Sequence, residues 1–380
     1  MPLGAGLIAP GTPVDQLETP ALLVDLDVLE RNLDEMAALA RKHDVALRPH
    51  WKTHKCPDIA RMQTERGAVG GTVAKPGEAR EFLAEGFRDI LIATPVVDPR
   101  KIDRMLAAQG SADLAVLVES RDGARRWSAG AERAGVRLDV MMDVDVGMGR
   151  TGVAPGEDAV ALARAIAADS HLRLRGVMTH AGHGYGAASP EELAEIGRAE
   201  GKILVETAEA VRAAGIPCPE VSVGSTPTVR HSAAVRGVTE IRPGNYVFHD
   251  GIQVALGVVG ADRCALTVLA TVIARPAPDR VVLDSGSKTL ATDRGRGDLQ
   301  GFGSVMEIPN LTVDRVWEEH GLIRLPDGAD LKETELRTGD RVRVVPNHAC
   351  VVVNLHDRLF AVRGGRVEAV WRVAARGLVR

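Results

Sequence analysis

The 380-residue sequence lacks the features of membrane, secreted and nucleic-acid-binding proteins. It has no apolar run near the ~20 residues that span a bilayer, and its N-terminus lacks the basic start and apolar core of a signal peptide. Its four cysteines are scattered, which argues against a disulfide framework. Lysine and arginine number 47 against 51 acidic residues, a net charge of −4 without a basic cluster. We therefore expect a cytoplasmic protein that binds neither membranes nor nucleic acid.

Short apolar runs alternate with amphipathic helical segments over the first two thirds of the sequence. Eight such alternations predict an α/β fold, a (β/α)8 TIM barrel over residues 20–250. An open doubly wound sheet is the alternative, but no GxGxxG motif follows the first predicted strand. The predicted strands cover residues 21–26, 46–50, 70–74, 89–95, 112–120, 137–146, 173–182 and 220–226.

The pattern changes after residue 250. Segments such as "LTVLATVIARP" and "RVRVVPNHACVVVNL" are rich in β-branched residues and are interrupted by Gly and Pro, with little helical periodicity. They predict a mostly-β domain over residues 251–380, to which residues 1–19 are expected to add.

Titratable side chains concentrate in "LRPHWKTHKCPD", residues 47–58. Alternate residues of a strand share a face, so Arg48, His50 and Lys52 would point the same way. In a barrel strand over residues 46–52, Lys52 would lie at the carboxyl end, where barrel active sites form. Lys55 would open the next helix. A partly desolvated lysine among cations has a lowered pKa and suits a Schiff base, although an isolated loop lysine more often lies on the surface without a catalytic role.

His348 and Cys350 lie two residues apart in "VVPNHACVVVNL". In a strand they would share a face, and imidazole with thiolate suits Zn2+ or a similar divalent ion. Two ligands are too few for a closed structural site, so the pair would belong to a catalytic site completed by water or substrate. The alternative is a buried histidine beside a buried cysteine.

Other polar motifs follow predicted strands. "VDVGMGRTGV" carries Arg150, and "THAGHGYG" carries His183 and Tyr185. Amides and hydroxyls in "VGSTPT", which contains Ser225 and Thr226, could hold a phosphate. "RPGNYVFHD", with Gly244 and Asn245, could provide a second phosphate-binding segment. Each motif taken alone is also compatible with an ordinary loop.

Together and in order, "RPHWKTHK", "DVGMGRTGV", "HAGHGYG", "VGSTPT", "RPGNYVFHD", "EHG" and "PNHAC" resemble the metal-dependent fold-type III pyridoxal-phosphate enzymes. That family includes D-threonine aldolases, D-serine dehydratases and D-threo-3-hydroxyaspartate dehydratases. The resemblance runs from "LETPALLVDLD" to "WRVAARG". It implies an alanine-racemase-like barrel with a C-terminal β domain, a homodimer, and small D-amino acids as substrates.

The resemblance also implies roles for individual residues. Lys52 would form the Schiff base with pyridoxal 5'-phosphate, and His348 and Cys350 would bind a divalent metal (Zn, Mn, Mg or Co). The hydroxyl proton of the substrate would go to His183 or to a hydroxide on the metal. The remaining cofactor-site residues would be Arg150, facing the pyridine nitrogen, Tyr185, in a segment that lines the substrate pocket, and Ser225, Thr226, Gly244 and Asn245, in the phosphate-binding loops.

Two branches of the family fit different parts of the chain. Cys350 and the middle segments look like the dehydratases, since the aldolases usually have aspartate at that position. The tail "VNLHDRLFAV…VWRVAARG" looks like the D-threonine aldolases. We expect the aldolase reaction, which yields glycine and an aldehyde, with D-serine or D-threo-3-hydroxyaspartate dehydration as the alternative.

The scarcity of aromatic residues bears on two further possibilities. Tyr185 and Tyr246 are the only tyrosines, whereas alanine racemases of this fold use a tyrosine from the C-terminal domain as a second base. Ordinary racemase activity is therefore not expected. A non-catalytic cofactor carrier would consist of the barrel alone, and the long C-terminal part with its His348–Cys350 pair argues against it.

Overall fold

The computed structural model describes residues 8–110, 112–294, 299–308, 311–324 and 336–380. Its described residues form two compact units. The barrel unit comprises residues 34–52, 59–244 and 378–380. The β unit comprises the described parts of residues 1–33, 53–58 and 245–377.

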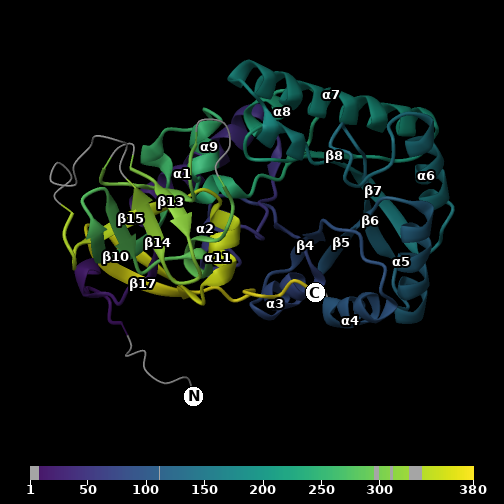
Figure 1. Ribbon diagram of the computed structural model, residues 1–380. Coiled ribbons are helices and arrows are strands. Elements are labelled where there is room, and N and C mark those ends of the chain that lie inside the picture. The colour runs from purple at the N-terminus through teal and green to yellow at the C-terminus, as the bar shows by residue number, and fades with distance from the viewer. Residues whose placement is uncertain (1–7, 111, 295–298, 309–310, 325–335) are drawn as a thin grey trace. The chain divides into compact units, whose positions relative to one another are not determined.

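Eight parallel strands form the sheet of the barrel unit, in the order β2-β9-β8-β7-β6-β5-β4-β3. A parallel bridge between His50 and Thr72 links the ends of this order. The predicted alanine-racemase-like barrel is thus confirmed (Figure 1). The strands are β2 (Ala46–Leu47), β3 (Gly71–Val73), β4 (Asp89–Ile92), β5 (Asp113–Val118), β6 (Leu138–Asp143), β7 (Leu172–Met178), β8 (Glu220–Val223) and β9 (Glu240–Ile241).

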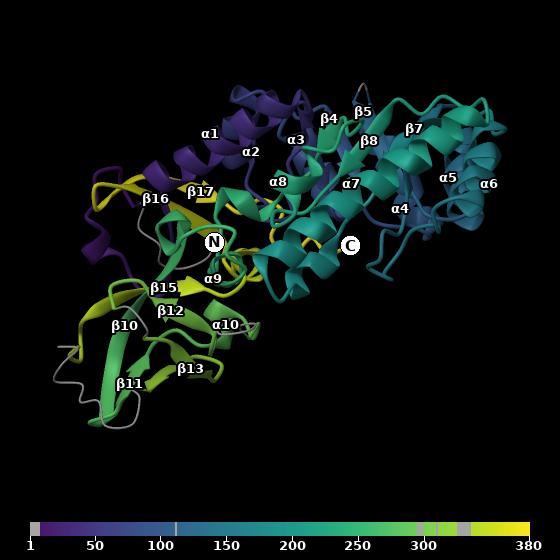
Figure 2. The same cartoon turned by 90° about the horizontal axis from the view of Figure 1, so that it is seen from above.

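Helices follow the barrel strands along the chain, and α4 to α7 lie on the outside of the strands (Figures 1 and 2). Side-chain caps begin three of them, since Asp98, Ser120 and Ser189 each accept a backbone N–H from the first turn. The helices are α1 (Leu26–His43), α2 (Pro57–Glu65), α3 (Pro76–Ala84), α4 (Pro99–Gln109), α5 (Arg121–Ala134), α6 (Glu157–Ala167), α7 (Pro190–Ala213) and α8 (Val229–Ser232). None of the described helices is long and apolar enough to cross a membrane.

Trp51 anchors the segment that leads to Lys52. Its ring is fully buried, with its centroid 4.5 Å from that of Phe82 and 4.7 Å from that of Phe87. A Cβ atom on Gly71 would lie 2.2 Å from the Trp51 ring, so only glycine fits at this point of β3. One of the few aromatic residues thus fixes the backbone next to Lys52.

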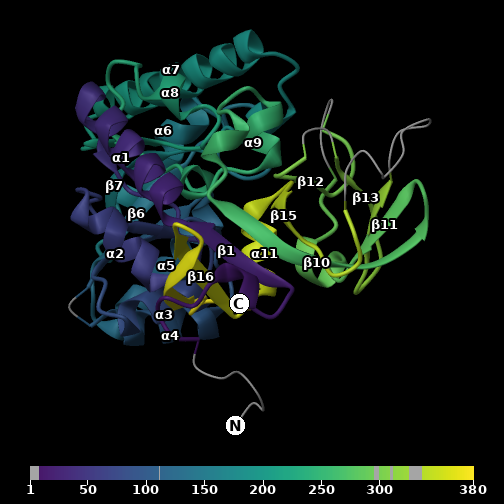
Figure 3. The ribbon, with the colours of Figure 1, turned by 90° about the vertical axis from the view of Figure 1, so that its left-hand side faces the viewer.

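The β unit contains the second sheet, in which β1 (Ala21–Asp25) pairs antiparallel with β10 (Leu266–Ala277) and parallel with β16 (Arg358–Arg363) (Figure 3). The prediction that residues 21–26 form the first barrel strand is therefore wrong, and β9 is the eighth barrel strand instead. A short run buried on both faces does not reveal its partners. The other strands are β11 (Arg280–Leu283), β12 (Gly303–Val305), β13 (Val313–Val316), β14 (Gly321–Arg324), β15 (Arg341–Pro346) and β17 (Arg366–Arg372).

Three short helices complete the β unit: α9 (Gly251–Ala255), α10 (Ser287–Leu290) and α11 (Ala349–Leu355). An apolar cluster holds the ends of the chain to its sheet, because Leu17, Leu23, Leu269 and Val367 pack together and are buried. The predicted mostly-β C-terminal domain is confirmed.

Candidate active site

Lys52 lies in a turn after β2, not at the end of a strand as predicted. Strand β2 ends at Leu47, and Pro49 interrupts the regular ladder because proline has no N–H to donate. The chain still runs along its neighbours, since His50 N donates to Pro243 O at 2.9 Å and Trp51 N donates to Thr72 O at 2.7 Å. Lys52 therefore follows the carboxyl end of a barrel strand, although the regular strand is shorter than predicted.

Lys55 does not open the next helix. Its backbone has a left-handed φ of 50°, and α2 begins two residues later, at Pro57. The Lys55 Nζ donates to Asn354 Oδ1 at 2.8 Å within the β unit. Lys55 is thus held by a side-chain amide and lies in a different compact unit from Lys52.

Two buried histidines of the barrel unit lie close to Lys52. Burial, followed by the charge of Lys52, lowers the pKa of His180 to about 3, and the same two causes hold the pKa of His50 well below its usual value. The His180 Nδ1 lies 2.7 Å from Gly224 O. Arg242 lowers the pKa of both rings further. The barrel unit therefore gathers cations around neutral imidazoles, which suits an anionic ligand.

Asp145 organises the turn that carries Arg150. Its Oδ1 accepts N–H bonds from Gly147 at 3.0 Å, Met148 at 2.9 Å and Gly149 at 3.1 Å. Partial burial opposes ionisation, but these bonds prevail and the pKa of Asp145 is lowered. Arg150 follows this turn and is exposed.

His183 and Tyr185 lie in a 3-10 helix, Gly182–Gly186, that follows β7. His183 interacts electrostatically with Asp145, so the ends of β6 and β7 bring these side chains together. The His183 Nδ1 is buried and has no hydrogen-bond partner within the described residues. Such an atom is suited to a bound group.

Ser225 and Thr226 follow β8 and are buried. The Ser225 Oγ and Thr228 Oγ1 lie 2.8 Å apart. Gly244 is the last residue of this stretch of the barrel unit, and Asn245 is the first of the β unit. The Asn245 Nδ2 donates to Asp250 Oδ2 at 2.5 Å, and its Oδ1 is buried without a partner within the described part of the chain.

His348 and Cys350 do not share a strand. Strand β15 ends at Pro346, His348 is the N-cap of α11, and Cys350 lies in the first turn of that helix. The β-branched run therefore misled the prediction, because valine-rich sequence also forms helix when the helix is buried. The two side chains still meet through a His348–Cys350 hydrogen bond, and Cys350 Sγ lies 3.4 Å from Thr53 Oγ1.

Two carboxylates support the His348–Cys350 pair. The Asp293 Oδ2 lies 2.5 Å from His348 Nδ1, and Asp250 Oδ2 accepts the Ala349 N–H at 2.9 Å. Burial alone would lower the pKa of His348, but Cys350, Asp250 and Asp293 raise it to about 10. The structure therefore surrounds this imidazole with acidic groups that also favour a bound cation.

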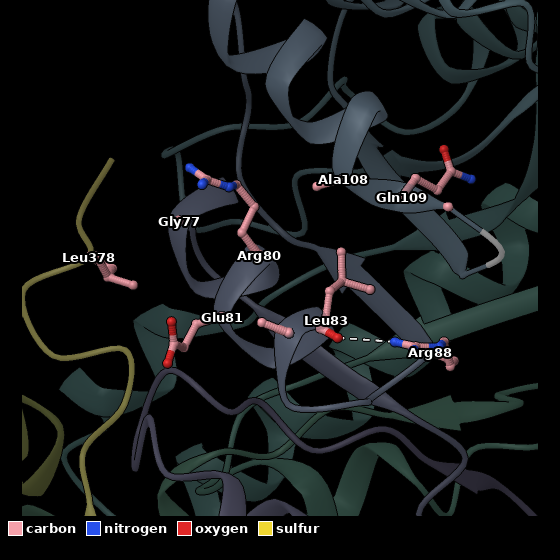
Figure 4. A pocket seen from close by; sticks show the side chains of 10 residues that line it. Gly77, Arg80, Glu81, Leu83, Arg88, Ala108, Gln109 and Leu378 are labelled. Carbon is pink, nitrogen blue, oxygen red and sulfur yellow. Dashed lines mark hydrogen bonds between the residues drawn. The ribbon is translucent and has the colours of Figure 1, made fainter.

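A separate cavity of about 660 Å³ lies beside α3 and α4 and contains none of the predicted site residues (Figure 4). Arg80 and Glu81 of α3, Gln109 of α4 and Leu378 line it, and the Arg88 Nη1 donates to Leu83 O at 3.0 Å. We assign no role to this cavity.

The residues fit the two groups that the resemblance implies. Lys52, Arg150 and Arg242 gather around His180, and buried hydroxyls lie nearby after β8, as an anionic phosphorylated cofactor requires. His348 and Cys350 are donors for a borderline divalent ion. Within the described residues, no three His, Cys, Asp or Glu side chains form a metal-binding group, so the protein donors alone would leave the ion open to water or substrate.

Several residues of this site escaped the sequence analysis. Arg242 is the first residue of the predicted phosphate segment "RPGNYVFHD" but was assigned no role, although its position after a strand could have revealed one. Asp145, within "DVGMG", could have been found as an aspartate that caps a glycine-rich turn. Asp250 and Asp293, in loops, carry no local signal.

Comparison with known proteins establishes the family. Residues 24–250 match the family model of the alanine racemase N-terminal domain, and residues 265–362 match a "Putative serine dehydratase domain". The chain belongs to the fold-type III family of pyridoxal-phosphate enzymes, and within that family it is a lyase.

Two relatives of different activity are equally similar in sequence. The D-threonine aldolase of Arthrobacter sp is 38% identical over 373 residues, which cover 98% of this chain and 96% of the relative. The D-threo-3-hydroxyaspartate dehydratase of Delftia sp. (strain HT23) is 38% identical over 348 residues, covering 88% and 91%.

Solved structures have the same fold. The crystal structure of D-threonine aldolase from Filomicrobium marinum matches with a TM-score of 0.92 and 32% identity, covering 99% of this chain and 100% of that one. A D-threo-3-hydroxyaspartate dehydratase solved in a metal-free form matches with a TM-score of 0.89 and 35% identity, covering 95% and 98%.

Proposed function

We propose that the protein is a D-threonine aldolase, which cleaves D-β-hydroxy-α-amino acids into glycine and an aldehyde. The observation that carries the proposal is the extent of its similarity to the Arthrobacter aldolase. At the same 38% identity, that similarity covers 98% of this chain, against 88% for the dehydratase. The tail that follows the His348–Cys350 pair also fits the aldolases best.

Pyridoxal phosphate, when bound, supplies an electron sink for the bond that breaks at Cα. Lys52 would hold the cofactor covalently, and Ser225, Thr226, Gly244 and Asn245 would bind its phosphate. Arg150 would face the ring nitrogen, and because a guanidinium keeps its proton, it would not protonate that nitrogen. Tyr185 would line the substrate pocket.

His348 and Cys350 would hold a divalent ion, which would supply Lewis-acid chemistry at the β-hydroxyl of the substrate. His183 takes the hydroxyl proton as the Cα–Cβ bond breaks. Its buried Nδ1, which lacks a partner within the described residues, is consistent with a role in holding a ligand or moving a proton. Asp145 interacts electrostatically with this ring.

Dehydration is the second candidate, and Cys350 is the observation that favours it. In that reaction Lys52 would remove the Cα proton and the β-hydroxyl would leave as water. The enamine released would then take up a water molecule and give a keto acid and ammonia. The same residues would bind the same two groups, so only the bond that breaks differs.

We also propose that the enzyme works as a homodimer in the cytoplasm, as the family resemblance implies. The barrel unit would bind the cofactor, and the β unit would carry the metal site. Light scattering of the purified protein would measure its mass in solution, and a monomer at working concentration would contradict the dimer.

Product analysis with D-threonine tests the assignment. Glycine and acetaldehyde in equal amounts are expected from the cofactor- and metal-loaded enzyme. Release of 2-oxobutanoate and ammonia would assign the protein to the dehydratases instead. The Lys52→Ala variant is the control, because it should give neither set of products.

A further inference from the structure

Glu200 is a buried carboxylate outside the predicted site. It lies near the middle of α7 with 1% of its surface exposed. Its Oε1 accepts N–H bonds from Ala181 at 3.2 Å and Gly224 at 3.1 Å, and its Oε2 accepts the Thr228 hydroxyl at 2.9 Å. A charged group is costly to bury, so these three donors are needed to hold it there.

The two N–H groups belong to the loops that carry the candidate site. Ala181 lies in the loop after β7, between His180 and His183, and Gly224 directly precedes Ser225 after β8. One carboxylate oxygen therefore ties these two neighbouring loops together. The Thr228 hydroxyl, which donates to Glu200, also lies 2.8 Å from Ser225 Oγ and extends the connection to that side chain.

Arg242 binds backbone carbonyl groups at the ends of β7 and β8, the strands from which these two loops start. Its Nη2 donates to Thr179 O and to Ser222 O, and its Nε donates to Ser222 Oγ at 2.7 Å. Burial raises the pKa of Glu200, whereas its donors and the charge of Arg242 oppose that rise. The negative Glu200 thus binds backbone N–H groups where β7 and β8 end, and the positive Arg242 binds backbone carbonyl groups there.

We propose that Glu200 is a positioning residue that presets the Gly224–Thr226 loop for the phosphate of pyridoxal phosphate. This inference rests on the proposed function, which assigns Ser225 and Thr226 to that phosphate. The carboxylate itself would repel a phosphate, so it acts by orienting its N–H and O–H donors. An oriented loop loses less conformational freedom when the phosphate binds, and this preorganisation increases affinity.

The test compares the binding of pyridoxal phosphate and of pyridoxal, which lacks the phosphate, to cofactor-free protein by equilibrium dialysis. Glu200→Gln keeps the shape of the side chain and removes its charge. It should weaken binding of pyridoxal phosphate about tenfold and leave binding of pyridoxal nearly unchanged. Thr228→Val, which removes only the hydroxyl that donates to Glu200, should cause a smaller loss of affinity for pyridoxal phosphate. If Glu200→Gln does not fold, this variant provides the test.

Glu78 provides a matched control in the same unit. It is also buried, at 2% exposure, and its Oε2 accepts the N–H groups of Ala74 at 2.7 Å and Lys75 at 3.2 Å after β3. Glu78→Gln should leave the preference for the phosphorylated ligand intact. Equal losses for both ligands in Glu200→Gln, no loss, or the same selective loss in Glu78→Gln would each overturn the inference.

Failure of the proposed function would look different. If the cofactor assignment fails, the parent protein would bind pyridoxal phosphate no better than pyridoxal, and Lys52→Ala would bind it as the parent does. If only the choice of the aldolase reaction fails, D-threonine would give 2-oxobutanoate and ammonia, while the binding results for Glu200→Gln stay as expected. A parent that prefers pyridoxal phosphate, with a Glu200→Gln variant that keeps this preference, would remove only the role of Glu200.

Discussion

The carboxylate of Asp293 lies 2.5 Å from Nδ1 of His348, on the same ring that hydrogen-bonds to Cys350. Asn347 fixes the backbone around this contact, since its Nδ2 donates to Asp293 O at 3.1 Å and to Gly301 O at 2.8 Å. A carboxylate on the second nitrogen of a metal-binding histidine sets the tautomer and the orientation of the ring. If His348 binds a metal ion as proposed, Asp293 would orient its ring without being a ligand.

Removing this carboxylate should weaken metal binding. We expect Asp293→Ala to lower the affinity of metal-free protein for Mn2+ by about 10- to 100-fold, measured by calorimetric titration. The double variant His348→Ala/Cys350→Ala should lose specific binding altogether. Asp357→Ala, which removes an exposed carboxylate of the β unit paired with Arg376, is the control. The orienting role would be contradicted if Asp293→Ala bound Mn2+ with the affinity of the parent protein while the double variant showed no specific binding.

Lys52 should be the only lysine modified when the holoenzyme is reduced with borohydride and digested. Peptide mapping should find the pyridoxyl group there because Lys52 lies beside the buried imidazoles of the barrel unit. Lys55 is bonded to Asn354, and Lys75 caps α3. Lys55→Ala should therefore retain the cofactor, whereas Lys52→Ala should not. A pyridoxyl group found on Lys55 or Lys75 would contradict the assignment of the cofactor to Lys52.

Buried His180 should make the stability of the cofactor-free protein depend on pH. Its folded pKa, about 3, lies below its unfolded value near 6.5. Between these values only the unfolded chain binds the proton, so stability is complete above pH 6.5 and falls as the pH drops toward 3. The loss is about 1.4 kcal/mol per pH unit in this window, or about 2 kcal/mol by pH 5.

Denaturant unfolding at pH 7 and pH 5 would measure this loss. His180→Asn keeps an N–H donor for Gly224 O and does not titrate. Between pH 7 and pH 5 the free energy of unfolding of this variant should therefore fall by about 2 kcal/mol less than that of the parent protein. The same decrease in variant and parent would show that His180 does not cause the pH dependence. His50, whose pKa is lowered for the same reasons, should contribute in the same direction.

The sequence was sufficient to predict the barrel because strand and helix periods alternate and polar residues follow the apolar runs. Placing Lys52, Arg150, His183 and Ser225 after barrel strands required only that rule. It could not place β1, because a strand buried on both faces looks the same in either sheet. The helical position of Cys350 was missed because β-branched residues have only a weak preference for strands.

Residues that act through others were not predictable. Glu200 lies 24 positions before Gly224, and Asp293 lies 55 positions before His348. Neither spacing corresponds to a helical or strand period, and a glutamate in a helix is ordinarily a surface residue. Only the folded chain shows that Glu200 is buried against two loops. Supporting carboxylates are therefore the part of this site that depends most on tertiary structure.

The enzyme should be selective for the D-configuration at Cα and tolerant at Cβ. Under the proposed function, three substrate groups would be held at once: the amino group by the cofactor that Lys52 anchors, the carboxylate, and the β-hydroxyl by the ion proposed for His348 and Cys350. An L-substrate with the same three anchors would turn its Cα–Cβ bond out of alignment with the cofactor ring. Lost alignment of this kind reduces the rate by roughly a few powers of ten. At Cβ only the hydroxyl is held, so the rest of the side chain is free to vary.

Separate incubations with D-threonine, L-threonine and D-serine measure this selectivity. Glycine should form rapidly from D-threonine and at least about a hundred times more slowly from L-threonine. Comparable rates on the two enantiomers would show that the three groups are not held together, and the proposed stereoselectivity would be wrong. Rapid pyruvate release from D-serine with no glycine from D-threonine would mean that the Cβ–O bond breaks instead of the Cα–Cβ bond. The three groups could then still be held, and the protein would be a dehydratase, the reaction that Cys350 favours.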